Sequence, residues 1–194
     1  MVPADLTEAL KQAYGAKARE RDGAMVAPWK LEERARFLAE LRQSGSRLLL
    51  ELGSGPGHDG RFFLEHGLSV VCIDLCPEMV MLCRVKGLEA YEMDVLRLDF
   101  PAASFDAVFA LNSLLHVPKA SIRAVLQGIH RILRPGGLFI QFAAETFDVM
   151  YFRRLEPGSR GRTHFQSMIL RRAADSPGTP LLAHAGARSA TSAP

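Results

Sequence analysis

The sequence is short of the features that mark membrane, secreted or disulfide-bonded proteins. It contains no run of 18 or more apolar residues, so we expect no segment to cross a bilayer. Its first residues lack a basic stretch followed by an apolar core, so we expect no secretion signal. Only three cysteines occur, all between 72 and 83, in a spacing that fits neither a disulfide framework nor a zinc site. We therefore expect a cytoplasmic protein with reduced thiols, no metal and no membrane partner.

A strong excess of charge of either sign is lacking too. The 194 residues carry a net charge of +3 and are 48% hydrophobic and 23% charged, which is ordinary for one globular domain. Residues 1–142 are neutral, whereas residues 143–194 contain seven arginines and four acids. This modest bias does not favour a nucleic-acid partner. Residues 173–194 are mostly small or polar, and we expect a disordered tail there.

Short apolar runs alternate with helical patterns along most of the chain. This alternation predicts an α/β fold, with a doubly wound and mainly parallel sheet whose helices lie on both faces. The expected strands are 47–52, 69–74, 88–93, 105–111 and 138–142, and the expected helices are 4–21, 28–43, 58–65, 77–86 and 119–133, with a turn at 134–137.

A glycine-rich turn follows the first strand. The segment Glu51-Leu52-Gly53-Ser54-Gly55-Pro56-Gly57 places three glycines at alternate positions. Missing Cβ atoms let backbone N–H groups approach a ligand closely near the start of the next helix. The alternative is an ordinary surface turn that happens to be rich in glycine.

Acidic residues end the next two strands, and ligands of such sheets bind at these carboxyl ends. Asp74 suits the hydroxyl groups of a ribose, or else caps the helix that begins at Pro77. Asp94 suits an adenine amine, or else is a solvated loop acid. Residues 55–60 also spell G-x-G-x-x-G, a nicotinamide-enzyme pattern. Glu51, however, would repel a pyrophosphate and attract an ammonium group, which favours a ligand with an α-amino end.

Taken together, these segments resemble the motifs of class I S-adenosylmethionine-dependent methyltransferases. The glycine turn resembles their first motif, E-x-G-x-G-x-G. The segments 71–74, 94–95, 105–116 and 133–137 resemble their later motifs in the expected order. Within that superfamily the chain is similar to the small-molecule enzymes of the ubiquinone and menaquinone biosynthesis type. The resemblance covers residues 30–142 and implies a Rossmann-like fold, S-adenosylmethionine as cofactor and a small-molecule acceptor.

The resemblance also implies a role for each matched position. The cofactor contacts would come from Glu51, Gly53, Ser54, Gly55 and Gly57 at the methionine end, from Asp74, Leu75 and Met79 at the ribose and adenine, from Asp94 and Val95 at the adenine, and from Leu111 and Asn112 at the sulfonium. His116 is the candidate general base, with packing before Pro118 as the alternative. We expect structural roles for three further residues, with His58 at the start of a helix and Tyr14 and Trp29 in packing.

The chain departs from the family after the fifth strand. Segments 147–153 and 164–170 look like the last two strands, but only four residues separate Phe142 from Phe147, too few for a parallel crossover. We expect either an antiparallel hairpin or a rearranged edge. The expected organisation is one domain, 1–172, with a helical cap (1–45), a cofactor-binding core (46–142) and a shortened edge (143–172).

Three hypotheses follow for the function. The first is methyl transfer to a small molecule. The second is a methyltransferase-like protein that binds the cofactor without catalysis, because the shortened edge could leave the acceptor pocket incomplete. The third is a nicotinamide-dependent oxidoreductase.

Overall fold

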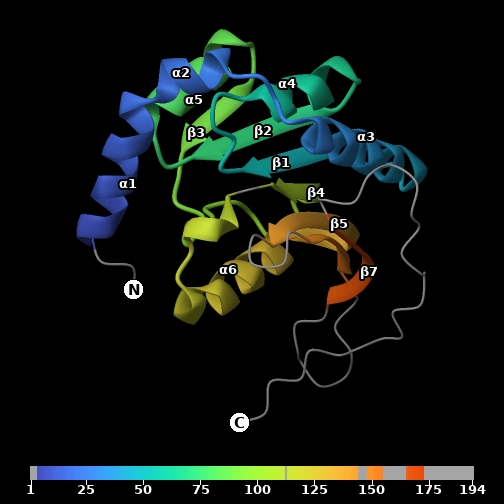
Figure 1. The fold of residues 1–194 in the computed structure, drawn as a ribbon. Helices are drawn as coiled ribbons and strands as arrows, with labels where there is room; N and C mark the ends of the chain where they lie inside the picture. Colours follow the sequence, from blue (N-terminus) through green and yellow to red (C-terminus); the bar gives the residue numbers. More distant parts are fainter. Residues whose placement is uncertain (1–3, 112, 144–147, 155–164, 173–194) are drawn as a thin grey trace.

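One sheet of seven strands organises the molecule. The computed structural model describes residues 4–111, 113–143, 148–154 and 165–172, and the strand order is β3-β2-β1-β4-β5-β6-β7 (Figure 1). The elements in chain order are α1 Ala4–Ala16, α2 Ala18–Gly23, α3 Pro28–Gln43, β1 Leu48–Leu52, α4 His58–Glu65, β2 Ser69–Asp74, α5 Pro77–Val85, β3 Glu89–Glu92, β4 Phe105–Ala110, the 3₁₀ turn η1 Leu114–His116, α6 Lys119–Ile132, β5 Leu133–Ala143, β6 Asp148–Arg154 and β7 Phe165–Arg172.

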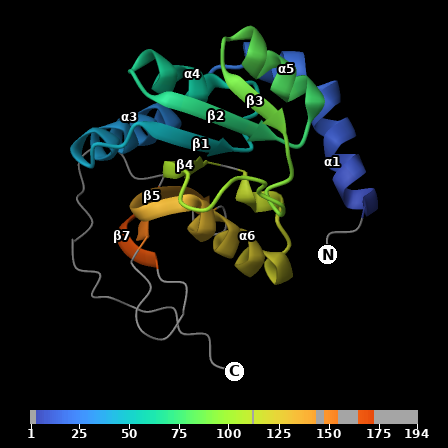
Figure 2. The same cartoon turned by 180° about the vertical axis from the view of Figure 1, so that it is seen from behind.

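The first five strands are parallel, and helices cover both of their faces. Successive side chains of a strand point to opposite faces. Leu49 accordingly packs with residues of α3, α4 and α5, whereas Leu50 packs with residues of α6. Figures 1 and 2 show α3 and α4 on one side of the sheet and α6 on the other. The predicted doubly wound α/β fold is confirmed.

The C-terminal edge is an antiparallel meander. β5 pairs antiparallel with β6, and β6 pairs antiparallel with β7. The hairpin alternative is therefore the correct one, because the short connection leaves no room for a helical crossover. The tail predicted at residues 173–194 lies outside the described residues.

One local prediction is wrong. The turn expected at residues 134–137 lies inside β5. Phe105 pairs with Leu133, and the next pairs start at Ala107 and Leu138, so the four intervening residues bulge from the strand. Gly136 takes the positive φ of 74° that such a bulge needs. A turn and a bulge share glycine as their signal, so local sequence does not separate them.

The N-terminal helices form an arm that lies beside the carboxyl ends of the strands. Lys11 of α1 forms an ion pair with Glu92 of β3, and Asp22 of α2 forms one with Lys86 after α5. α3 instead packs flat on the sheet, with Phe37 and Leu41 fully buried. Among the described residues, no helix has the length and apolar character needed to cross a membrane.

Candidate cofactor site

A cavity of about 400 Å³ lies between the N-terminal arm and the carboxyl ends of the strands. Most of the residues predicted from the sequence line it, because each follows or ends a neighbouring parallel strand. They are Glu51, Gly53, Ser54, Gly55, Asp74, Leu75, Asp94, Val95, Leu111 and His116. A volume of this size suits a small organic ligand.

The glycine turn is built for close backbone approach. Gly53 and Gly55 have φ values of 63° and 53°, a region that side chains other than glycine rarely adopt. A Cβ atom on Gly53 would lie 2.4 Å from the Cβ of Ser113, whereas nothing lies within 4 Å of a Cβ on Gly55. The absence of a side chain at Gly53 thus lets Ser113, in the loop that follows β4, pack against the glycine turn. The absence of one at Gly55 leaves open space beside the cavity.

Two predicted residues do not line this cavity. Gly57 precedes α4, with a φ of 82°, and a Cβ there would lie 2.8 Å from the sulfur of Cys83. Met79 is fully buried and packs with Ala18 and Cys76. Both residues pack behind the residues that line the cavity. α5 presents Met79 to the arm because α2 packs over that face. Asn112 lies outside the described residues.

Glu51 places a buried carboxylate at the floor of the cavity. The residue is only 3% exposed, and burial, followed by the charge of Asp59, raises the pKa of Glu51 well above its ordinary value of 4.5. Its Oε2 accepts a weak hydrogen bond from the Cys72 thiol at 3.5 Å. A buried carboxylate with so little compensation favours a cationic partner in the cavity.

The two strand-end acids are held by backbone N–H groups. Asp74 accepts from Gly55 at 2.8 Å and from Cys76 at 2.9 Å, so it fixes the glycine turn and the start of α5. Burial raises its pKa, and these hydrogen bonds act against that rise. Asp94 accepts from the N–H of Leu96 at 2.9 Å. Both carboxylates keep acceptor capacity for a ligand.

Sequence reasoning missed most of the contribution of the arm. The Tyr14 hydroxyl lies 2.6 Å from Nε2 of His116, and the Arg21 guanidinium lies 4.4 Å from the centre of the Tyr14 ring. These three side chains line the cavity with Lys11 and Lys30. Tyr14 therefore does more than pack. The only sequence signal for this role was a tyrosine hydroxyl on the apolar face of a predicted helix. That pattern is also common in ordinary protein cores.

Comparison with known proteins agrees with this geometry. A family described as a methyltransferase domain matches residues 49–137. A ubiquinone biosynthesis O-methyltransferase of Xanthomonas oryzae pv. oryzae is 34% identical over an alignment of 147 positions, which covers 68% of this chain and 59% of that protein. The chain thus spans less than two thirds of the length of that relative.

Solved structures show the same fold. A Burkholderia thailandensis 1,6-didemethyltoxoflavin-N1-methyltransferase with bound S-adenosylhomocysteine aligns over 85% of this chain and 73% of its own, with a TM-score of 0.57 and 24% identity. An amino pentose methyltransferase from Micromonospora echinaspora, with S-adenosylmethionine bound, aligns over 80% of each chain, with a TM-score of 0.56 and 21% identity.

The nicotinamide alternative is not supported by these matches, and Glu51 disfavours a pyrophosphate at the glycine turn. The strand order, the glycine turn and the family match all lead to the same assignment. Residues 49–137 are a methyltransferase domain of the class I S-adenosylmethionine-dependent family.

Proposed function

We propose that this protein transfers a methyl group from S-adenosylmethionine to a hydroxyl group of a small-molecule acceptor. The observation that carries the proposal is the buried Glu51 carboxylate beside an open glycine turn, in a cavity that Asp74 and Asp94 also line. This set fits a ligand with an ammonium group at one end and a ribose with a purine at the other.

Each end of the cofactor finds a chemical partner among the lining residues. Glu51 would pair with the ammonium group, and Lys30 would pair with the carboxylate of the same amino acid. Lys30 lies in the field of both Glu51 and Asp59, and burial lowers its pKa. Asp74 would accept from the ribose hydroxyls, and Asp94 would accept from the adenine amine. Gly53 and Gly55 leave the backbone accessible between them.

The bound cofactor supplies an activated methyl carbon on a sulfonium, whose displacement leaves S-adenosylhomocysteine. The protein then has to align the acceptor and remove its proton. Tyr14 and His116 suit this task as a pair. The acceptor hydroxyl would give its proton to the Tyr14 oxygen, and the Tyr14 proton would pass to Nε2 of His116. His116 is exposed and can return the proton to water.

Methyl transfer from labelled S-adenosylmethionine to a fraction of small metabolites tests this function. The wild type should label a small molecule, and Tyr14→Phe should lower kcat at least tenfold while S-adenosylhomocysteine binding stays within about threefold, since one proton-transfer group typically contributes 10²–10⁴-fold. Gln12→Ala, an exposed change on the same helix, is the control. Tight cofactor binding without labelling would favour the non-catalytic alternative.

We also propose that the protein acts in the cytoplasm. Its three cysteines are buried free thiols, which a reducing compartment would preserve.

A further inference from the structure

Within the part of the chain that the structure describes, not every basic side chain on the N-terminal side of the cavity forms an ion pair with a carboxylate. Three basic side chains of the arm and of α3 line the cavity: Lys11, Arg21 and Lys30. Lys11 is paired with Glu92. Among the described residues, neither Arg21 nor Lys30 forms an ion pair with a carboxylate. Arg21 and Lys30 therefore face the cavity without a carboxylate partner among the described residues.

Of the four acids that line the cavity, Asp59, Asp74 and Asp94 have partners within the protein. Asp59 pairs with Arg34 at 3.1 Å, and Asp74 and Asp94 accept hydrogen bonds from backbone N–H groups. The charge of Arg21 acts against the rise that burial causes in the pKa of Asp74, although the two side chains form no ion pair. Burial lowers the pKa of Lys30, and the charge of Arg21 acts in the same direction. The N-terminal side of the cavity thus presents Arg21 and Lys30, and the strand ends present acids.

The proposed cofactor has only one carboxylate, so it can satisfy only one of these cations. Lys30 is the closer match, because it lies in the field of Glu51, the proposed partner of the ammonium group. With Glu51 assigned to the ammonium group and Lys30 to the carboxylate, Arg21 is left without a group of the cofactor to pair with. A second ligand that carries an anionic group could pair with Arg21.

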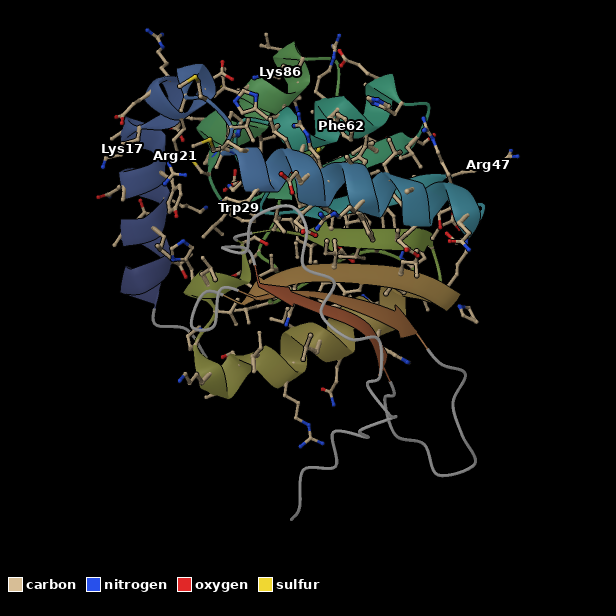
Figure 3. All side chains as sticks on the ribbon, turned by 45° about the vertical axis from the view of Figure 1, so that its right-hand side comes forward. Lys17, Arg21, Trp29, Arg47, Phe62 and Lys86 are labelled. Atoms are coloured by element: carbon tan, nitrogen blue, oxygen red, sulfur yellow. The ribbon has the colours of Figure 1, made fainter. Side chains whose placement is uncertain are left out.

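Arg21 is also well located for the acceptor. Its guanidinium stacks 4.4 Å from the centre of the Tyr14 ring, whose hydroxyl contacts His116. One tyrosine side chain thus separates the guanidinium from the proposed proton acceptor. Figure 3 labels Arg21 on the arm and Trp29 at the start of α3. Stacking orients the planar fork, which matches a carboxylate or a phosphate in two parallel hydrogen bonds.

We infer that the methyl acceptor is a hydroxy acid, whose anionic group pairs with Arg21 while its hydroxyl group meets the Tyr14–His116 pair. The inference rests on the proposed methyl transfer and goes beyond it by naming the chemical class of the acceptor. Arg21 is a specificity residue in this scheme, and it takes no part in the proton transfer.

Calorimetry on the full chain saturated with S-adenosylhomocysteine tests the inference with pairs of probes that differ in charge. The pairs are para-hydroxybenzoate with para-hydroxybenzamide, para-hydroxycinnamate with its amide, and para-hydroxyphenyl phosphate with hydroquinone. At least one anion should bind at least tenfold more tightly than its neutral partner. The pair that shows this preference distinguishes a carboxylate from a phosphate.

Arg21→Gln should remove that preference and leave S-adenosylhomocysteine affinity within about threefold of the wild type. Arg19→Gln is the matched control, because Arg19 is an exposed arginine of the same short helix that does not line the cavity. Equal binding of acids and amides, no binding of any anion, or an unchanged preference in Arg21→Gln would each overturn the inference. A loss of S-adenosylhomocysteine binding in Arg21→Gln would overturn it as well and assign Arg21 to the cofactor.

Discussion

Burial of Glu51 lowers the stability of the fold and provides a binding group for the proposed ligand. Removing an ionised carboxylate from water costs folding free energy, and among the described residues the hydrogen-bond donor to Glu51 is the weak Cys72 thiol. The raised pKa means that burial shifts the ionisation equilibrium of Glu51 toward the neutral acid. Its contribution to stability is therefore present at low pH and is lost as pH rises through the raised pKa.

Glu51→Gln should make the pH dependence of cofactor binding shallower. An ammonium group pairs with the ionised carboxylate, so wild-type affinity for S-adenosylhomocysteine should rise with pH from 4.5 up through the raised pKa of Glu51. The variant should bind at least tenfold more weakly at neutral pH and should be as stable as the wild type or more so. Calorimetry and urea unfolding measure the two effects, with exposed Glu32→Gln as the control. An unchanged affinity would argue against the ammonium seat.

Gly53 and Gly55 offer a matched pair for testing the glycine turn. Both have positive φ, but only at Gly53 would a Cβ atom meet another side chain, at 2.4 Å from Ser113. Gly53→Ala should lower the free energy of unfolding by roughly 2–4 kcal/mol, from backbone strain and overlap together. Gly55→Ala should cost about 1 kcal/mol, from strain alone. Equal losses in urea unfolding would mean that the β4 loop moves freely away from Gly53.

At the scale of elements, Asp106 joins three strands at the end of the sheet opposite the cavity. Its carboxylate accepts from the N–H groups of Arg47 and Leu48, both at 2.9 Å, and pairs with Arg134 of β5. Figure 3 shows Arg47 at the far end of the molecule from Arg21. Burial acts to raise the pKa of Asp106, but these hydrogen bonds and the arginine charge lower it overall.

Asp106→Ala should lower the free energy of unfolding by about 1–3 kcal/mol at neutral pH, because the N–H groups of Arg47 and Leu48 lose their acceptor. With a lowered folded pKa, the contribution of the carboxylate is present above 3.8 and is lost as pH falls through the folded value. The difference between variant and wild type should therefore shrink in acid. Urea unfolding at several pH values checks this, with exposed Asp99→Ala as control. A constant difference would contradict it.

The elements that the sequence predicted well are those whose local pattern of apolar residues matches the face that is buried in the fold. Leu49 and Leu50 belong to a fully apolar run, and that run became a strand buried on both faces. Ile129 lies on the apolar stripe of α6, against the opposite face of the sheet from α3. Arg134–Gly137 was misjudged, because β4 offers pairing partners on both sides of the bulge and keeps the strand continuous. Such a tertiary effect leaves no local signal.

At the scale of the molecule, the strand-end residues of the site could be predicted from the sequence, whereas those of the N-terminal arm could not. Glu51, Asp74 and Asp94 could be located from sequence, because parallel strands bring their carboxyl ends to one edge. Tyr14 and Arg21 could not, because their position depends on how the arm docks against α5 and β3. That docking rests on pairs such as Lys11 with Glu92, which are 81 residues apart in the chain.

The proposed function requires the glycine turn to bind a ligand with an amino-acid end and an adenosine end. Calorimetric titration of the full chain with S-adenosylhomocysteine, methylthioadenosine and NAD measures whether it does. We expect S-adenosylhomocysteine to bind, methylthioadenosine, which lacks the amino-acid end, to bind at least tenfold more weakly, and NAD to show no binding. Tight binding of NAD, or equal affinity for S-adenosylhomocysteine and methylthioadenosine, would contradict the account.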